Sequence, residues 1–537
     1  MKKQWWKETT VYQIYPRSFK DSNGDGNGDI NGITSKIDYL KTLGVGAIWL
    51  CPIYKSPMID NGYDVEDYYE VNPMYGTMAD MENLIAKADE AGIKIVLDII
   101  PNHTSDQNVW FKKALLNDPQ YKDYYIFKDE PIEEITSVFG GKAWSQTEDG
   151  RWYLHKFAPQ QVDLNWDNPK VREEFRKITD FWIKKGVYGF RFDVIDDIAK
   201  NLDSELIKKG ENIDIKKLHE YVYEWRNESI WKDFDLLTVG ESWDASVEKA
   251  ILYSDSQRDE FSMVFGFEHI STNWTSEGKW TAKEFNLVDF KKVIQKWQDG
   301  LHTNGWNSLF LNNHDLPRLI STFGDDKKYR IESAKAIALT MHLLQGTPYI
   351  FQGEEIGMTN CKFLSLEEHN DVEVTQMYAT KKGKDWNEED HLKFVSKYTR
   401  DNARTPIQWD GNIGAGFTTG KPWLKINENF KNINVENAIN DKNSIFYWYQ
   451  KLISLRKDAK FKDVIREGKF EIIEMENKNI FAFTRTLNNQ KITLISNWSN
   501  ETVSLSNVND EGSIVMNNYE TFSKDKILPW QSIMITK

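Results

Sequence analysis

The stretch YGFRFDVIDDI, residues 188–198, decides how this chain folds, because it predicts a β-strand that ends in charged side chains. Residues two apart in a strand point the same way, so Arg191 and Asp193 are expected to lie side by side. A guanidinium beside a carboxylate keeps that carboxylate ionised at neutral pH, as a nucleophile requires. An isolated Arg-x-Asp pair is more often structural than catalytic, so its meaning depends on the ends of the other strands.

Seven further apolar runs resemble this strand. They lie between helix-like segments and lack the alternation of a half-exposed strand, which is typical of a parallel sheet covered on both faces. Almost all of them end in Asp, Glu, His or Asn, which favours an α/β fold built as a (β/α)8 TIM barrel with its active site at the strand ends. A doubly wound sheet would not usually place acids at so many strand ends. The eight strands are predicted within residues 11–19, 45–54, 93–105, 187–195, 235–243, 261–267, 306–315 and 347–355.

Two interruptions indicate further domains. An aromatic and polar stretch over residues 104–169 is too long for a βα loop, so we expect an inserted domain after the third strand. Short apolar runs separated by turn residues predict a C-terminal antiparallel β-sandwich over residues 461–537. The barrel would then comprise residues 1–103 and 170–460. The charged segment 353–410 follows the eighth strand and is expected to form a wall of the site.

Composition restricts the partners of the protein. The 537 residues carry a formal net charge of −14, which argues against nucleic acid or an anionic membrane surface and favours a small neutral ligand. No apolar run is long enough for a membrane span or a signal peptide. Only Cys51 and Cys361 are available, so no disulfide framework is expected. We therefore expect a cytoplasmic protein, and a monomer.

Three carboxylates stand at the ends of the fourth, fifth and seventh strands: Asp193, Glu241 and Asp315. Cleavage of a glycosidic bond with retention of configuration requires a nucleophile and a general acid about 5 to 5.5 Å apart. Strand ends across a barrel mouth can provide that spacing. Structural ion pairs would explain any one of these acids, but they explain poorly all three together with His103 and His314.

Several motifs carry a family resemblance. DIIPNH (98–103), GFRFDV (189–194), VGES (239–242) and NNHD (312–315) resemble the four conserved segments of the α-amylase superfamily, glycoside hydrolase family 13, in their usual order. QVDLNW (161–166) is similar to the fifth segment of that superfamily, in the form seen in oligo-1,6-glucosidases. NGYD, QGEEIGM and RDNARTPIQW extend the similarity over nearly the whole chain.

The resemblance implies roles for the predicted site residues. Asp193 would be the nucleophile, Glu241 the general acid and base, and Asp315 the carboxylate that stabilises the transition state. Glu241 must then hold a proton near neutral pH, which requires a raised pKa. A stacking ring and a charged clamp would close the pocket behind the terminal glucose and restrict cleavage to the non-reducing end. The residues implied to bind this sugar are Tyr63, Asp64, His103, Arg191, His314 and Arg400. Taken separately, either histidine could cap a loop, and Arg400 could form an ordinary salt bridge.

Three residues concern the leaving side of the scissile bond. Relatives that act on α-1,6 bonds have Val after the nucleophile, as Val194 is here, whereas α-1,4-specific relatives tend to have Ala, Gly or Thr. Alternatively, Val194 merely suits a strand. Trp243 is implied to stack on the leaving glucose, and Lys279 to contact a second sugar. SVFGGKAW and NNHDLPR look like glucan 1,6-α-glucosidases, also called dextran glucosidases. The resemblance therefore implies an exo-acting, retaining α-glucosidase that releases glucose from isomalto-oligosaccharides and dextran fragments.

The loop DSNGDGNGD, residues 21–29, resembles the first part of an EF-hand, but Gly32 stands where the twelfth-position glutamate is expected. Relatives hold calcium or magnesium here, so one structural ion and no organic cofactor are expected. The alternative is a metal-free turn rich in Asp and Asn. The predicted ligands are Asp21, Asn23, Asp25, Asn27 and Asp29.

Three other functions are compatible with parts of the pattern. A trehalose-6-phosphate hydrolase shares nearly all these motifs but needs a cationic pocket for the phosphate. A sucrose isomerase is disfavoured because its arginine-rich loop after NNHDLPR is missing. A non-catalytic, transporter-associated relative would carry a membrane helix and lose the acids, whereas this chain keeps all three.

Overall fold

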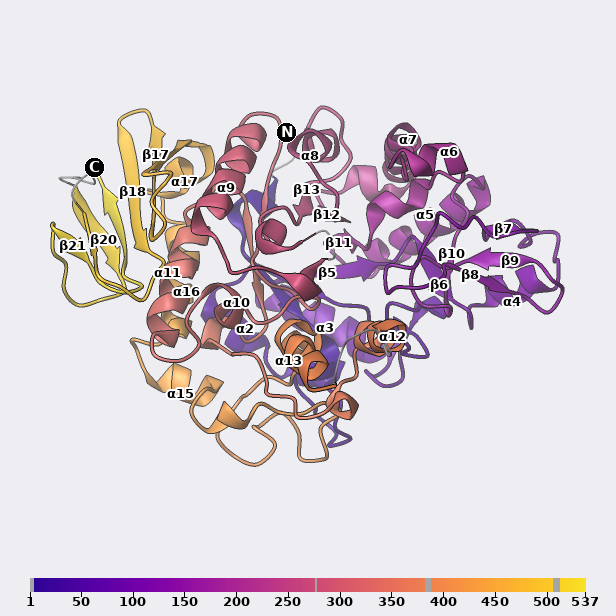
Figure 1. Cartoon of the computed structure of the whole chain (residues 1–537), viewed down its shortest axis with the longest axis horizontal. Coiled ribbons are helices and arrows are strands. Elements are labelled where there is room, and N and C mark those ends of the chain that lie inside the picture. Colours follow the sequence, from indigo (N-terminus) through magenta and orange to yellow (C-terminus); the bar gives the residue numbers. More distant parts are fainter. Residues whose placement is uncertain (1–3, 276–277, 382–387, 506–511) are drawn as a thin grey trace.

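The centre of the molecule is a closed barrel of eight parallel strands (Figure 1). The computed structural model describes residues 4–275, 278–381, 388–505 and 512–537. The strands follow the order β13-β12-β11-β5-β2-β1-β15-β14. A parallel bridge between Val264 and Asn307 joins the two ends of this sheet, which confirms the predicted (β/α)8 barrel.

Each barrel strand falls inside one of the eight predicted apolar runs. The strands are short and buried on both faces, as parallel strands covered by helices are. They are β1 (Val11–Ile14), β2 (Ala47–Leu50), β5 (Lys94–Ile99), β11 (Gly189–Phe192), β12 (Leu237–Ser242), β13 (Met263–Gly266), β14 (Ser308–Leu309) and β15 (Thr347–Phe351).

Amphipathic helices surround the barrel. Helix α5 shows how the sequence specifies them: Asn168 caps its first turn by accepting a hydrogen bond from Lys170 N, and Pro169 occupies the first helical position. One face of α5 is buried and carries Val171, Phe175, Ile178 and Trp182. The main covering helices are α2 (Ile37–Leu43), α3 (Met78–Glu90), α5 (Pro169–Lys184), α7 (Ile215–Asn227), α8 (Val247–Ser254), α9 (Leu287–Leu301), α11 (Arg330–His342) and α16 (Ile445–Leu455).

The chain leaves the barrel after β5 and returns at α5. Strands β6 (His103–Ser105) and β10 (Gln161–Asp163) pair antiparallel and form the stem of this excursion. Beyond the stem lie α4 (Val109–Leu115) and a three-stranded antiparallel sheet, on the far side of the barrel from the C-terminal sheet (Figure 1). The stem brings Gln161 of β10 beside His103 of β6. The small sheet contains β7 (Phe127–Lys128), β9 (Trp152–Leu154) and β8 (Trp144–Gln146).

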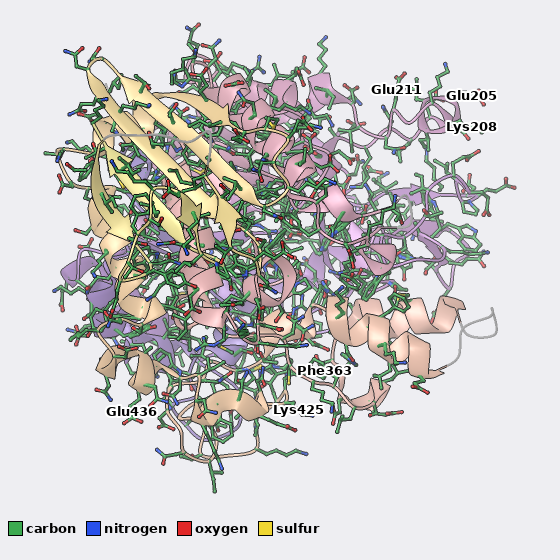
Figure 2. All side chains as sticks on the ribbon, turned by 60° about the vertical axis from the view of Figure 1, so that its left-hand side comes forward. Glu205, Lys208, Glu211, Phe363, Lys425 and Glu436 are labelled. Atoms are coloured by element: carbon green, nitrogen blue, oxygen red, sulfur yellow. The ribbon has the colours of Figure 1, made fainter. Side chains whose placement is uncertain are left out.

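The C-terminal region is antiparallel, as predicted. After α17 (Lys462–Glu467), five strands pair in the order β16-β17-β18-β22-β20, and β19 (Val503–Ser504) pairs with β21 (Lys526–Ile527). Figure 2 shows the larger sheet on the side of the molecule opposite Glu205 and Lys208. The five strands are β16 (Lys469–Ile473), β17 (Ile480–Leu487), β18 (Gln490–Asn497), β20 (Ser513–Asn517) and β22 (Ser532–Thr536). Lys291 of α9 attaches this region to the barrel by donating to three backbone carbonyls, those of Glu474, Asn477 and Ile480.

The segment after β15 carries α12 (Val372–Lys381), α13 (Glu388–Tyr398) and α14 (Asp401–Arg404). It forms part of the wall of the main cavity, as expected for this charged stretch. Within the described ranges, no helix is both long and apolar enough to cross a membrane.

Candidate active site

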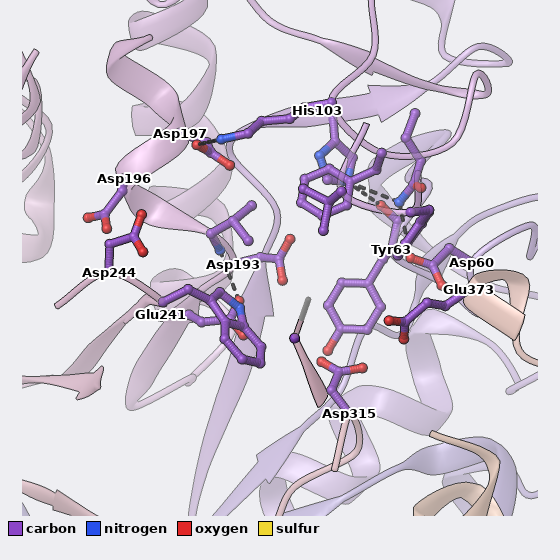
Figure 3. A pocket seen from close by; sticks show the side chains of 18 of the residues that line it. Asp60, Tyr63, His103, Asp193, Asp196, Asp197, Glu241, Asp244, Asp315 and Glu373 are labelled. Atoms are coloured by element: carbon purple, nitrogen blue, oxygen red, sulfur yellow. Dashed lines mark hydrogen bonds and ion pairs between the residues drawn. The ribbon is translucent and has the colours of Figure 1, made fainter. Parts of the chain in front are cut away.

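A cavity of about 490 Å³ opens at the C-terminal ends of the barrel strands and holds the three predicted carboxylates (Figure 3). The barrel supplies one part of its lining, the inserted region another, and the segment after β15 a third. Nine of the twelve residues predicted for catalysis or substrate binding line this cavity. They are Tyr63, His103, Asp193, Val194, Glu241, Trp243, Lys279, Asp315 and Arg400.

Arg191 connects the acids at the base of the cavity. Its Nη1 donates to Asp98 Oδ1 at 2.8 Å and to Asp193 Oδ1 at 2.7 Å. Its Nη2 lies 2.6 Å from Glu241 Oε2. Strand register explains the arrangement, because Arg191 of β11 stands opposite Asp98 of β5, and β12 with Glu241 is the next strand on the other side. One buried guanidinium therefore holds the two predicted catalytic carboxyl groups a short distance apart.

The proton balance of this cluster is set by burial. Burial raises the pKa of Glu241, although Arg191 opposes the shift. Burial also raises the pKa of Asp193 well above its usual value, against Arg191 and with help from the charges of Glu241 and Asp98. Arg191 lowers the pKa of Asp193, as expected, but burial acts in the opposite direction and has the larger effect. One guanidinium faces three carboxyl groups, and burial raises the pKa of all three, as expected for carboxyl groups that share a proton.

Val194 is strained. Its φ of 36° lies in the left-handed region, where a β-branched residue is a genuine outlier. Asp193 and Val194 follow the end of β11, and Val194 is the residue before the 3-10 helix Ile195–Ala199. The Val194 backbone N–H donates to Glu241 Oε2 at 3.1 Å. Strand preference therefore does not explain a valine here, and the turn joins the nucleophile position to the acid.

Asp315 lies beside two arginines and a histidine. Arg404 Nη2 donates to Asp315 Oδ1 at 2.9 Å, and Arg400 Nη1 donates to the same oxygen at 3.3 Å. His314 Nε2 is 3.0 Å from the other oxygen. Burial raises the pKa of Asp315, but these neighbours outweigh it and hold the pKa well below its ordinary value. Asp315 is therefore a permanent negative charge.

Tyr63 forms one wall beside Asp315. It lies in the loop between β3 (Tyr54–Lys55) and β4 (Asp67–Val71), and its ring stacks on that of His314 at 5.2 Å. The Tyr63 hydroxyl donates to Asp98 Oδ2 at 3.0 Å. Burial lowers the pKa of His103 to about 3 and that of His314 to about 4, so both imidazoles are neutral at pH 7.

Three of the predicted substrate contacts do not line the cavity. Arg191 and His314 are buried behind the lining, where they orient the acids and Tyr63. Asp64 is also behind the wall, because its carboxylate accepts hydrogen bonds from the backbone N–H groups of Ile59 and Asp60. The structure thus corrects the role predicted for Asp64. Asp60 faces the cavity instead, 3.2 Å from Arg400 Nη2.

The sequence analysis did not predict several acidic residues that lie in the cavity lining or behind it. Asp371 Oδ1 accepts from Arg400 Nη2 at 2.6 Å and from Nε at 2.8 Å, and Glu373 lies 2.7 Å from Lys279 Nζ. Glu373 lines the cavity, and Asp371 lies directly behind Arg400. Asp196 and Asp197 were visible in the opening stretch, next to the nucleophile, and could have been assigned to the rim.

The mouth of the cavity is aromatic and more open. Trp243 is 40% exposed and stacks on Phe267 at 3.8 Å. Trp274 and Trp280 also line the mouth. On the rim, Asp244 is exposed and Lys156 is paired with Asp197. An aromatic mouth with a few polar groups is suited to holding the faces of sugar rings.

The carboxylates of Asp21 and Asp29 in the 21–29 loop accept hydrogen bonds from the loop and from nearby residues. Asp21 accepts from the backbone N–H groups of Asn23, Gly24 and Gly26 and from the Thr418 hydroxyl. Asp29 accepts from Ser22 and Gly32. In the described part of the chain, no group of three or more His, Cys, Asp or Glu is arranged to hold a metal ion. The predicted ligands Asp21, Asn23, Asp25, Asn27 and Asp29 thus do not form a carboxylate cage, and the ion stays a prediction.

Comparisons with known proteins agree with this geometry. Residues 13–468 match the family model described as the catalytic domain of alpha amylase. The chain is 47% identical to an oligo-1,6-glucosidase of Parageobacillus thermoglucosidasius, over 94% of this chain and 92% of that protein. It is 45% identical to a glucan 1,6-alpha-glucosidase of Streptococcus pneumoniae, over 100% of this chain and 99% of that protein. A solved structure of a Bacillus licheniformis trehalose-6-phosphate hydrolase gives a TM-score of 0.94 at 40% identity, covering 99% of both chains.

Proposed function

The chain belongs to the alpha-amylase family, and from that membership and the geometry of its cavity we propose an exo-acting, retaining α-glucosidase. Its substrates are isomalto-oligosaccharides and dextran fragments. It hydrolyses their α-1,6-glucosidic bonds from the non-reducing end and releases glucose.

The observation that carries this proposal is the pair of acids on one guanidinium. Asp193 binds Nη1 of Arg191 and Glu241 lies 2.6 Å from Nη2, so one guanidinium holds the two carboxyl groups close together. Retaining glycosidases need this close arrangement, with the two groups about 5 to 5.5 Å apart. Asp193 attacks the anomeric carbon while Glu241 protonates the leaving oxygen. Glu241 then deprotonates the water that releases glucose, so the α configuration is retained.

The closed end of the cavity supports exo action. Asp60, Tyr63 and Arg400 surround the space beside Asp315, and Arg400 is anchored by Asp371. Hydroxyl groups of a terminal glucose find charged partners there, whereas a continuing chain would meet a wall. The permanent charge of Asp315 stabilises the positive oxocarbenium-like transition state.

The charge pattern of the wall favours a neutral substrate. A phosphorylated sugar needs a cation that is available to its phosphate. Among the described lining residues, each cation already has an acid: Lys156 pairs with Asp197, Lys279 with Glu373, and Arg400 with Asp371. Exposed Asp244 adds a further negative charge at the rim.

A substrate panel tests the proposal. Purified protein is given isomaltose, isomaltotriose, maltose, starch and trehalose-6-phosphate, and glucose release is followed together with the anomeric configuration of the first product. We expect α-glucose from isomaltose and isomaltotriose and little from starch. Release of β-glucose would refute the mechanism.

Trehalose-6-phosphate hydrolysis is the second candidate, because a structure of such an enzyme superposes on this chain with a TM-score of 0.94. The panel separates the two functions. A much higher kcat/KM for trehalose-6-phosphate than for isomaltose would overturn the substrate proposal and leave the retaining mechanism intact.

A structural calcium or magnesium ion at the 21–29 loop is a further proposal, supported by the family resemblance and by the exposed side chains of Asn23 and Asp25. Such an ion binds the folded state only, so its removal should lower the melting temperature. Melting curves with and without a chelator measure this. Identical curves would remove the ion from the description of this protein.

We also propose a cytoplasmic, monomeric enzyme. Both cysteines, Cys51 and Cys361, are buried and unpaired, which suits a reducing compartment. Light scattering after size-exclusion chromatography tests the oligomeric state against the chain mass of 62.9 kDa.

A further inference from the structure

A second cavity, of about 700 Å³, lies between helix α7 on one side and the end of α8 with the segment that follows it on the other. It shares no residue with the active-site cavity. Its volume falls in the range of about 300 to 1,000 Å³ that is usual for small-molecule sites. From α7 it is lined by residues spaced to lie on one helical face, Ile215, Lys216, His219, Glu220 and Tyr223, and from the other side by Leu252, Gln257, Arg258 and Glu260.

The floor of this cavity is rigid. His219 Nδ1 lies 2.5 Å from Glu260 Oε2, and Arg258 Nη2 lies 2.6 Å from Glu260 Oε1. Asp259, between the last two residues, has a φ of 56° and is held by Arg226 at 2.5 Å. A left-handed residue fixed by an ion pair keeps its neighbours in place before any ligand arrives.

The outer wall, in contrast, has unused binding groups. The side chain of Tyr223 is 55% exposed, although it is large and aromatic. Neither its hydroxyl nor the Gln257 side-chain amide hydrogen-bonds to another residue of the described chain. An exposed phenol ring beside an amide, over a fixed floor, can stack on a flat ring and bond to its hydroxyl groups.

The charges of the cavity balance. Lys216 and Arg258 are balanced by Glu220 and Glu260, so these four lining residues have a formal net charge of zero. The whole chain has a formal net charge of −14. A balanced wall gives no preference for an anion such as a phosphate or a nucleotide. It suits a neutral ligand that offers both donors and acceptors, as a sugar does.

A chain of three packed side chains, His219, Tyr253 and Asp196, connects the two cavities through the interior. His219 lines the second cavity, and its ring packs on Tyr253 with centroids 4.8 Å apart. The Tyr253 hydroxyl donates to Asp196, which lines the active-site cavity, at 2.5 Å. Tyr253 is therefore the one side chain between a lining residue of each cavity along this path, and the two cavities lie in the same region of the molecule.

We propose that this second cavity is an ancillary carbohydrate-binding site that holds an internal segment of a neutral glucan, stacked on Tyr223. The choice of an α-1,6-glucan as the polymer rests on the proposed function. Binding of one segment raises the local concentration of chain ends at the catalytic cavity, so long substrates gain and disaccharides do not.

The test compares Tyr223→Ala with the parent enzyme on isomaltose and on a dextran fraction. Loss of one stacking ring should raise KM for dextran by about three- to tenfold and leave kcat/KM for isomaltose unchanged. Tyr223→Phe keeps the ring and should behave as the parent. Phe234→Ala is the matched control, because Phe234 is an exposed aromatic residue, 45% accessible, that lines neither cavity.

A binding measurement separates this site from catalysis. Electrophoresis through gels that contain dextran should retard the parent protein more than Tyr223→Ala. Equal retardation and an equal dextran-to-isomaltose ratio of KM values would overturn the ancillary site. A protein that hydrolyses no isomaltose but still loses retardation on Tyr223→Ala would refute the proposed function and support the second site.

Discussion

The two ends of the catalytic cavity are built on different principles. At the closed end, Arg400 contacts Asp60, Asp315 and Asp371, and all four side chains are largely shielded from solvent. At the mouth, Trp243 is 40% exposed. The closed end is an ionic network of four charged side chains. The mouth is mainly aromatic and has two separate ion pairs among the described lining residues, Lys156 with Asp197 and Lys279 with Glu373.

This difference indicates that the two ends select different parts of the substrate. Buried charges cost desolvation energy and are stable only as a complete set, so the closed end tolerates one geometry and one sugar ring. Exposed rings and half-buried ion pairs contribute little individually and adapt to different partners. The closed end therefore determines that a terminal glucose binds, and the mouth determines what may be attached to it.

The largest effect is expected from Asp193, the proposed nucleophile. Asp193→Asn should lower kcat by several orders of magnitude, on the order of 10⁴- to 10⁶-fold, because no covalent intermediate can form. Steady-state rates on isomaltose measure the loss. The melting temperature is the control, since Asn keeps the volume of the side chain; an active variant free of deamidation would refute the assignment.

The distinction between the two ends is tested most directly by a substitution of Asp371 in the closed end. Asp371→Asn removes the closest partner of Arg400 and leaves a buried guanidinium undercompensated. We expect kcat/KM for isomaltose to fall by about 10- to 100-fold and the free energy of unfolding by about 3 kcal/mol. Steady-state kinetics and denaturant unfolding measure both effects.

Glu373→Gln is the matched substitution at the mouth, two residues along the chain. Glu373 also lies 3.6 Å from Arg400 Nε, but Arg400 keeps its nearer partners Asp371 and Asp60 in this variant, so stability should fall by less than in Asp371→Asn. The effect on rate should appear mainly with isomaltotriose. Equal losses from Asp371→Asn and Glu373→Gln would show that the two ends are not distinct.

The parts of this site that the sequence predicted are those fixed by periodic structure. Asp193 and Glu241 stand at the ends of neighbouring parallel strands, and such ends must meet at one face of a barrel. Asp64 was predicted in place of Asp60 because both lie in an irregular loop, where side-chain direction follows no period. Asp371 is 29 residues from Arg400, and only tertiary packing joins them.

Val194 shows a second limit of prediction from the sequence. A valine within an apolar run predicts an extended conformation, yet its φ is 36°. Local preference therefore pointed to the wrong conformation. Tertiary contacts hold the residue there, including the hydrogen bond from its N–H to Glu241, and such conflicts are expected where a chain is shaped for function.

A substitution of Val194 changes the leaving side of the cavity and leaves the closed end unchanged. Val194→Ala removes two methyl groups beside the scissile bond, so a leaving glucose on an α-1,4 bond should fit more easily. We expect the ratio of kcat/KM for isomaltose over maltose to fall by about tenfold. Ile195→Val is the control, because Ile195 is buried and does not line the cavity. An unchanged ratio would exclude Val194 as a determinant of linkage.

The smallest expected effect is a shift of the pH profile. Asp193 must be ionised to attack, and the negative charge of Asp98 helps to raise the pKa of Asp193. Asp98→Asn removes that charge, so the pKa of Asp193 should fall and the acid limb of kcat/KM should move to lower pH. A shift of about half a pH unit corresponds to a roughly threefold gain in relative rate on the acid side of the pH profile.

Asp64→Asn is the control. It changes a buried carboxyl group outside the cluster and should leave the acid limb of the kcat/KM profile in place. A limb that stays unmoved, or moves to higher pH, in Asp98→Asn would mean that the acid limb does not report Asp193.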